Sequence, residues 1–515
     1  MPNENVTVYW ELASDNSFSP SSIVRSGQYT AKPDFAHSVH VDAGLEGTGS
    51  PLTAYTTYYY RFGVDKKSDN PVTYAYTSPT GRTKTAPSSG WLPAQSTPMK
   101  LAFASCQHWE SGYYPAYRHL AGQKDLDLVV HLGDYIYEGA PSKGNILRTK
   151  PGGSGYDYHS AVADPSWGCN TLTDYRNRHA QYKTDPDLQA AHATHPWVVT
   201  WDDHEVENDY AGTKSWYRQS DFAQRRAAAY QAYYEHMPLR SSSIKLGTDG
   251  KVQNIDLYRQ IPYGNLAQFL VLDTRQFRTE QPCGDQGSLI EPSCKERSQD
   301  PILRNNKPYR RHTILSAEGS ATATNPWLMD KQESWLQGKL TSSGPTWNVL
   351  AQQVPMFQYD HRDWTGNFYS ESWDSYVAAR NRILKHIVDK GVGNPVVLTG
   401  DMHSSWAANL ETNFNDTSHT DVIGCEFVST SISSGLGSGW DSTYKKALPY
   451  NKHVTYYDGR NGGYVLCKVN PEYWQSDYYL AGSLSSGGAS VSRVASWYVQ
   501  AGNVRSGTRA GIPLG

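Results

Sequence analysis

From about residue 96 onward, short apolar runs alternate with amphipathic segments of helical period. This alternation predicts layers of helix on sheet, and several runs are apolar throughout, as in strands covered on both faces. The expected strands are Lys100–Ala104, Leu126–Leu132, Trp197–Trp201, Ala267–Leu272, Trp347–Ala351, Val396–Thr399 and Val422–Val428. The expected helices are Tyr113–Ala121, Thr173–Tyr182, Asp221–Met237, Pro326–Leu340 and Tyr376–Lys390. We therefore expect one large α/β domain over residues 96–515.

The first 95 residues have a different pattern. Val6–Leu12 and Tyr55–Val64 are strand-like, turn residues separate such runs, and no helical period is present. These features predict a separate small β-sandwich domain over residues 1–95. The segment Thr85–Pro98, which is rich in Pro, Ser and Thr, is expected to be the linker.

Composition narrows the classes of protein that remain. A chain of 515 residues with 38% hydrophobic and 19% charged residues has an ordinary globular balance. The formal net charge of -3 gives no basic field that would attract nucleic acid. There is no apolar stretch of 18 residues, so we expect no transmembrane segment. Oligomeric state cannot be predicted from these features.

The N-terminus lacks the charged and apolar regions of a signal peptide. If the protein is secreted, as we expect, a leader has been removed. Among the six cysteines, Cys283 and Cys294 bracket a short loop-like segment and are predicted to form a disulfide. Cys425 and Cys467 lie in strand-like runs and could bridge neighbouring strands. Cys169 has no evident partner or role.

Four polar clusters each follow an apolar strand. Because strand ends meet at one edge of a layered α/β fold, these clusters can converge on one site. They are Ser105-Cys106-Gln107, Gly133-Asp134-Tyr-Ile-Tyr137-Glu138, Trp201-Asp-Asp203-His204-Glu-Val-Glu-Asn208 and Gly400-Asp401-Met-His403. The long Gly-, Ser- and Pro-rich segment Glu138–Cys169 follows the second cluster, where it is either part of a pocket rim or a plain surface insertion.

The donor types in these clusters suit a metal centre. Carboxylate, amide and phenolate oxygens favour Ca²⁺, Mg²⁺, Mn²⁺ or Fe³⁺, whereas thiolate and imidazole allow iron or zinc. Each residue alone has a structural alternative. Asp134 can cap a helix, Asp203 and His204 can be a buried hydrogen-bonded pair, and Cys106 can be a small buried side chain or pair with Cys169.

Taken together, these motifs resemble those of the PhoD-like alkaline phosphatases and phosphodiesterases. This family lies within the calcineurin-like metallophosphatase group and includes a streptomycete metal-dependent phospholipase D. The resemblance covers the whole chain and implies a layered α/β/β/α sandwich with an N-terminal Ig- or fibronectin-like β-sandwich. It also implies one Fe³⁺ and one or two Ca²⁺, with Zn²⁺ or Mn²⁺ as alternatives.

The resemblance also implies a role for each residue that matches the family pattern. Cys106 and Tyr137 would ligate Fe³⁺, with Asp134 bridging the metals. Asn208 would ligate Ca²⁺, and Asp401 and His403 would complete the centre. The pair Asp203 and His204 replaces the Asn-His pair of ordinary metallophosphatases, and His204 would lie near the leaving group.

Two arginines are candidates for binding phosphate. Arg176 lies in Asp174-Tyr-Arg176, and Arg275 lies in Leu272-Asp-Thr-Arg275. A structural ion pair is the alternative for each of them.

The function implied is hydrolysis of phosphomonoesters, phosphodiesters or both by a metal-bound hydroxide. A phospholipase D-type phosphodiesterase that acts on phospholipids with the same centre is the alternative. An alternative from another class is a carbohydrate-binding or adhesive protein, which the complete set of candidate ligands argues against.

Overall fold

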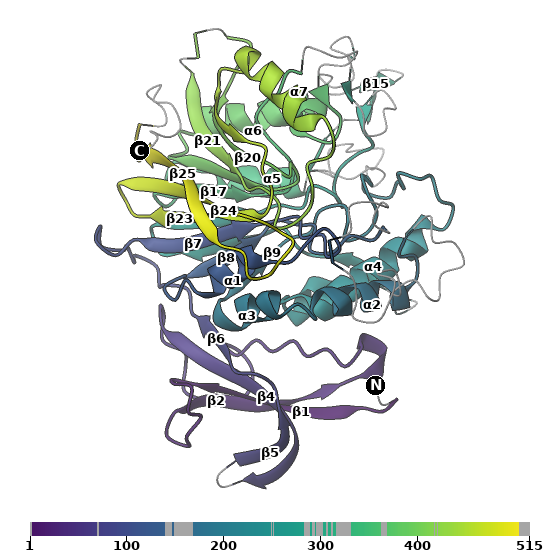
Figure 1. Cartoon of the computed structure of the whole chain (residues 1–515), viewed down its shortest axis with the longest axis vertical. Helices are drawn as coiled ribbons and strands as arrows, with labels where there is room; N and C mark the ends of the chain where they lie inside the picture. Colours follow the sequence, from purple (N-terminus) through teal and green to yellow (C-terminus); the bar gives the residue numbers. More distant parts are fainter. Residues whose placement is uncertain are drawn as a thin grey trace.

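The computed structural model describes residues 3–69, 72–139, 147–148, 168–248, 250, 252–282, 289–290, 294, 302–304, 307–310, 313–315, 331–361, 368–416, 418–419 and 421–503. The fold consists of a β-rich N-terminal domain beneath a larger α/β body (Figure 1). Most of the predicted loop Glu138–Cys169 and the start of the predicted helix at Pro326 lie outside the described residues.

The N-terminal domain is built on an antiparallel sheet of order β3-β2-β1-β4-β5, with β6 also paired to β4. Its strands are β1 (Val6–Ala13), β2 (Ile23–Ala31), β3 (Thr48–Gly49), β4 (Thr57–Asp69), β5 (Val72–Thr77) and β6 (Gly81–Lys84). A small core around Trp10, Leu12 and Tyr58 holds it together. The predicted β-rich domain is confirmed, and the described strands belong to one connected sheet.

Two large sheets form the centre of the α/β body. The six-stranded sheet has the order β25-β24-β23-β7-β8-β9, and the seven-stranded sheet has the order β12-β13-β17-β19-β21-β20-β22. The strands of the first are β7 (Met99–Ala104), β8 (Leu128–His131), β9 (Trp197–Val199), β23 (Gly463–Val469), β24 (Tyr473–Ala481) and β25 (Val491–Gln500). The strands of the second are β12 (Arg259–Tyr263), β13 (Ala267–Val271), β17 (Trp347–Ala351), β19 (Pro395–Thr399), β20 (Ser405–Glu411), β21 (Val422–Val428) and β22 (Val454–Asp458). Short pairs link β10 (Ile244–Leu246) with β11 (Val252–Ile255), β14 (Leu289–Ile290) with β18 (Phe368–Tyr369), and β15 (Ile302–Arg304) with β16 (Lys307–Arg310).

The period-two alternation of side chains explains why these sheets pack on both faces. Phe103 and Val130 of one sheet meet Phe269, Val349 and Val396 of the other in a shared core. The alternate residues of these strands face the outer side of each sheet, where they pack against the helices in two further cores. The expected α/β/β/α order of layers is confirmed.

Helices cover both outer faces of the pair of sheets (Figure 1). They are α1 (Pro115–Ala121), α2 (Leu172–Tyr182), α3 (Pro186–Thr194), α4 (Phe222–His236), α5 (Lys331–Lys339), α6 (Val377–Asp389) and α7 (Trp440–Ala447). Helix α2 begins with a capping box between Thr171 and Asp174. Helix α6 buries Ala379, Ile383 and Ile387 along one stripe, which fixes the face it presents to the sheet.

The structure corrects one cysteine prediction and leaves another half described. Cys425 and Cys467 are free thiols, and their strands, β21 and β23, belong to different sheets. Cys294 is disulfide-bonded, and its predicted partner Cys283 lies outside the described residues. Cys106 and Cys169 are also free and buried, so the alternative of a bond between them is wrong.

Within the described ranges, none of the helices combines the length and apolar character that crossing a membrane requires.

Candidate metal centre

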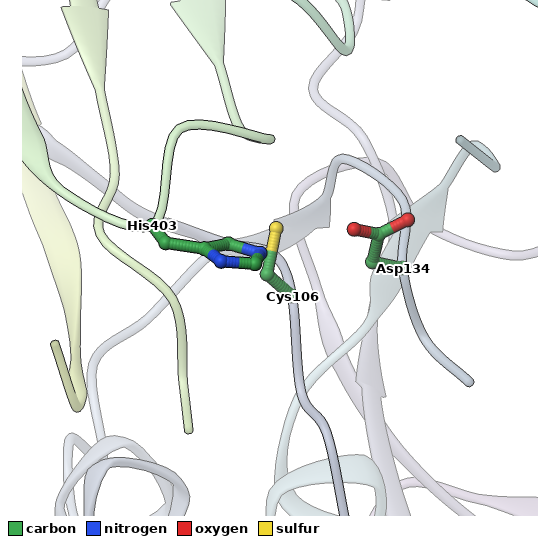
Figure 2. Close-up of side chains that lie close together, drawn as sticks. All are labelled: Cys106, Asp134 and His403. Carbon is green, nitrogen blue, oxygen red and sulfur yellow. The ribbon is translucent and has the colours of Figure 1, made fainter. Parts of the chain in front are cut away.

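The predicted clusters converge at one edge where the two sheets meet. Strands β7, β8 and β9 run parallel, and so do β17, β19 and β21, which brings their carboxyl ends together. A parallel bridge between Ser105 and Ser431 joins the two edges. Figure 2 shows the thiol of Cys106 between the imidazole of His403 and the carboxylate of Asp134.

The backbone turns sharply after each of these strands. Cys106, Asp134, Asp401 and His403 have positive φ angles of 60°, 54°, 64° and 49°. Such angles are uncommon for residues other than glycine and are concentrated at functional sites. The turns redirect the side chains from the strand faces toward the edge.

The glycine that precedes each of two ligand candidates is needed for close backbone approach. A Cβ on Gly133 would lie 2.5 Å from the Cβ of Asp202, and Gly133 itself has a φ of +113°. A Cβ on Gly400 would lie 2.6 Å from the Oγ of Ser105. The two Gly-Asp pairs therefore fit only because these positions lack a side chain.

The first group of donors is Cys106, Asp134 and His403, each of which offers one atom within 4.8 Å of the others. The Tyr137 hydroxyl lies 3.0 Å from Asp134 Oδ2 and 3.0 Å from His403 Nε2. The Nδ1 of His403 lies 2.8 Å from the carbonyl oxygen of Gly435. Since a carbonyl only accepts, this contact assigns the proton to Nδ1 and leaves the Nε2 lone pair facing the group.

Two further groups overlap the first. Asp134, Asp203 and His204 form one, and Asp202, Asp203 and Asp401 form the other, with the same 4.8 Å limit. Asp134 and Asp203 each belong to two groups, so the donors form a continuous chain rather than separate sites. This arrangement can hold more than one ion, with Asp134 in the shared position.

Glu138 orients the remaining candidates. Its carboxylate accepts a hydrogen bond from the backbone N–H of Asn208 at 2.7 Å and contacts His204 Nδ1 at 2.7 Å. The Asn208 side chain donates to Asp209 Oδ2 at 2.8 Å. Asn208 and His204 thus lie on the side of the centre formed by the loop after β9.

Buried negative charge dominates the electrostatics. Burial and the neighbouring charge of Asp203 raise the pKa of Asp134 well above its usual range, and burial and Asp202 do the same to the pKa of Asp401. Burial also raises the pKa of the Cys106 thiol and of the Tyr137 phenol, in both cases with help from Asp134. Burial lowers the pKa of His204, but the adjacent carboxylates raise it well above its usual value.

The donor set therefore fits bound cations. Asp134 Oδ1 and Asp203 Oδ1 are buried and accept no hydrogen bond from the described residues. Buried carboxylates without enough partners are strongly destabilising, and metal ions are the usual compensation. Oxygen donors beside a thiol and an imidazole suit both a hard cation and iron or zinc.

Both arginine candidates have structural partners. Arg275 is fully buried, with Nε 2.5 Å from Asp202 Oδ1 and Nη1 2.6 Å from Glu371 Oε2. It therefore holds the carboxylate of Asp202, a member of one donor group, in place. Arg176 is not brought to the centre; it makes two contacts with Glu235, at 2.6 and 2.7 Å, and one with the Asp34 carbonyl at 2.8 Å. We therefore leave Arg176 out of the site, because its guanidinium is occupied elsewhere.

Sequence reasoning missed several residues of the centre. Asp203 was a candidate from the sequence but its neighbour Asp202 was not, although both lie in the segment that follows β9. Glu205 accepts hydrogen bonds from the backbone N–H groups of Asp134 and Asp202, at 3.1 and 2.7 Å, and so ties two strand ends together. Ser434 Oγ lies 2.7 Å from the Tyr137 hydroxyl, in a Ser-rich segment that carries no recognisable motif.

Two packed sheets whose strand ends carry this donor set form the framework of a metal-binding hydrolase. A family model described as PhoD-like phosphatase matches residues 101–478, and one described as PhoD-like phosphatase, N-terminal domain, matches residues 1–87. The chain belongs to the PhoD-like phosphatase family. The domain boundary predicted between residues 95 and 96 stays a prediction.

Individual relatives agree with this assignment. The chain is 44% identical over 506 residues to alkaline phosphatase D of Bacillus subtilis (strain 168), a match that covers 97% of this chain and 76% of the relative. A solved structure of PhoD superimposes with a TM-score of 0.80 at 41% identity, covering 100% of this chain and 86% of the other.

Proposed function

We propose that this chain is a phosphoric ester hydrolase of the alkaline phosphatase D type. The observation that carries the proposal is the chain of three overlapping donor groups at the sheet edge, with its excess of buried carboxylates. Such a set can hold adjacent cations that clamp a phosphoryl group. The named relative favours a phosphatase over the phospholipase D alternative.

In this proposal Cys106, Tyr137 and His403 would hold Fe³⁺, Asn208 and Asp401 would hold Ca²⁺, and Asp134 would contribute to both. The mixture of a thiol and a phenol with oxygen donors supports this division, and Zn²⁺ or Mn²⁺ are the alternatives. When bound, the ions would neutralise charge on the phosphoryl oxygens and make water more acidic.

Hydrogen bonds around the proposed metal positions orient the histidines of the site. The contact between His403 Nδ1 and the Gly435 carbonyl keeps Nε2 available as a ligand. Glu138 fixes His204 through Nδ1, so that Nε2 is the nitrogen that can give a proton to a leaving oxygen. The His204 side chain is 20% exposed, so a substrate can reach it. Asp203, adjacent to Arg275 Nη2 at 3.6 Å, holds a negative charge beside His204.

An oxidising, extracellular location is part of the proposal. The disulfide at Cys294 supports it, because such bonds persist outside the reducing cytosol.

The test compares rates on nitrophenyl phosphate, bis(nitrophenyl) phosphate and phosphatidylcholine before and after removal of metal ions. We expect hydrolysis of at least one nitrophenyl ester, loss of rate on chelation, and recovery when Ca²⁺ is returned to enzyme that has kept its iron. Absence of hydrolysis of both nitrophenyl esters by the metal-replete protein would refute the proposal. Faster turnover of phosphatidylcholine than of either ester would favour the phospholipase alternative.

A further inference from the structure

A second group of side chains whose donor atoms could hold a metal ion lies away from the centre just described. Glu411 ends β20, His419 lies in the loop between β20 and β21, and His453 directly precedes β22. One donor atom from each of these residues lies within 4.8 Å of the others. Strand β20 begins just after His403 and spans about 20 Å, so this group lies at the opposite end of the strand.

The sheet register explains how the three residues meet. Strand β20 pairs with both β21 and β22, with Glu411 opposite Val422 and Ala408 opposite Val454. The backbone N–H of Asn409 donates to the His453 carbonyl at 2.8 Å. The end of β20, the loop between β20 and β21, and the residue before β22 therefore hold the group.

His453 is oriented as a metal ligand. Its Nε2 lies 2.6 Å from the carbonyl oxygen of Gln358, which can only accept a hydrogen bond. The proton is therefore on Nε2, and Nδ1 carries a lone pair. The residue is 2% exposed, and Nδ1 is buried without a hydrogen-bond partner among the described residues. A carbonyl that fixes the tautomer from behind is the usual arrangement at metal-binding histidines.

Glu411 supplies the negative charge. Its side chain is 0% exposed, and its carboxylate lies 3.0 Å from His419 Nδ1. Burial raises the pKa of Glu411, and the nearby charges of Asp421 and Asp416 add to that effect against the His419 contact. An ion pair satisfies Glu411 and His419, but it leaves the buried Nδ1 of His453 without a hydrogen-bond partner among the described residues.

We propose that Glu411, His419 and His453 bind a divalent transition-metal ion of the zinc class. Two imidazoles and one carboxylate are a common zinc set, with water in the fourth position. A tetrahedral ion with bonds of about 2.0–2.2 Å separates its donors by roughly 3.4 Å, which lies between the 3.0 Å contact of Glu411 with His419 and the 4.8 Å limit of the group, so only small adjustments are needed. The bound ion fastens the β20–β21 loop to the start of β22.

The test measures zinc per chain in purified holoenzyme dialysed against Zn²⁺, for the natural chain and for His419→Ala and Glu411→Gln. Glu411→Gln retains a hydrogen-bonding partner for His419 but removes the anionic donor. The matched control is His386→Ala. Like His453, His386 contacts a backbone carbonyl, that of Leu340 at 3.0 Å, but it belongs to none of the donor groups. Any zinc bound at the catalytic centre contributes equally to every protein, so it does not affect the difference in zinc content between them.

We expect the natural chain and His386→Ala to carry one more equivalent of zinc than either cluster variant. Added Zn²⁺ should raise the melting temperature of these two proteins by several degrees more than that of the two cluster variants. Turnover of nitrophenyl phosphate should be the same in all four proteins. Equal zinc content and equal thermal shifts in folded His419→Ala and Glu411→Gln would overturn the proposal and leave an ion pair only. A loss of turnover together with the zinc would also overturn it, because that zinc would then belong to the catalytic centre.

Discussion

Asp134 is one of two side chains, with Asp203, that each belong to two donor groups of the centre. Asp134→Asn keeps the shape and removes the charge, so cations should bind less tightly and align less well. We expect turnover to fall by at least about 100-fold, the scale seen when one electrostatic contact of an active site is lost. Steady-state kinetics with metal analysis and circular dichroism would measure this.

The control for this change is Asp185→Asn. Asp185 is also buried, but it caps α3 by accepting hydrogen bonds from two backbone N–H groups at 2.8 and 2.9 Å. Asparagine can still accept these bonds but loses the charge that pairs with Arg148 Nη1 at 2.7 Å, so this variant should lose stability and keep its turnover per folded molecule. Near-normal turnover in Asp134→Asn would remove that residue from the proposed centre.

Ser434 gives a second test at this scale. Its hydroxyl lies 2.7 Å from the Tyr137 hydroxyl and 2.9 Å from the Cys106 carbonyl, so it positions two proposed ligands. We expect Ser434→Ala to lower kcat by about tenfold, as changes behind metal ligands commonly do, with little effect on KM. Ser433→Ala is the matched control, because Ser433 instead donates to the His108 carbonyl at 2.7 Å. Equal rates for both variants would mean that Ser434 has no positioning role.

At the residue scale, Asp134, Asp401 and His403 were candidates from the sequence because a Gly-Asp pair after an apolar run marks a strand end, and the structure places each of them in a candidate donor group. Ser434 and Glu371 could not, since they come from segments without a periodic pattern and reach the centre only through long-range packing. The same limit applies to Arg176, because its partners Glu235 and Asp34 are distant in the sequence and could not be predicted from it.

At the scale of elements, the C-terminal end of α2 presents an unusual lysine. Lys183 Nζ lies 3.3 Å from the Tyr135 hydroxyl, and burial lowers the pKa of Lys183 to about 8. Because the folded state binds this proton less tightly than the unfolded chain does, the residue destabilises the fold below pH 8. The cost disappears as the pH rises from 8 toward the unfolded pKa near 10.5.

We therefore expect Lys183→Met to stabilise the protein at pH 7 by about 1–3 kcal/mol. The gain should shrink as the pH rises through 8 to 10.5. Denaturant unfolding across this range would measure it, with exposed Lys385→Met as the control. A gain that does not change with pH would show that packing, rather than the charge, is responsible.

The strands that were predicted in the α/β body share one property. Parallel strands such as β17 and β19 are buried on both faces and therefore stand out as apolar runs. Strand β25 and helix α7 were not predicted, because they are partly exposed and mix polar residues into their pattern. Their pairing or packing depends on the rest of the fold, which local periodicity does not report.

At the scale of the whole molecule, Arg176 connects the two domains. Its guanidinium binds Glu235 of α4 and the Asp34 carbonyl of the N-terminal domain. Arg176→Gln leaves the buried Glu235 carboxylate poorly paired, so we expect the free energy of unfolding to fall by about 1–3 kcal/mol. Turnover per folded molecule should be unchanged.

The control for this prediction is Arg240→Gln, which alters an exposed ion pair with Asp42. It should change stability by much less. If Arg176→Gln lowered turnover sharply while leaving stability intact, the original expectation of a phosphate-binding arginine would be restored.

The left-handed turns at Cys106, Asp134, Asp401 and His403 have a consequence for how such a protein can change over time. Each conformation costs a non-glycine residue about 1–2 kcal/mol. Glycine at any of these four positions would relieve the backbone strain but remove a candidate metal donor. The same substitution would therefore raise the stability of the fold and lower its activity. Laboratory selection for heat resistance alone should accumulate glycines at these positions, and selection for growth on a phosphate ester should restore the original residues.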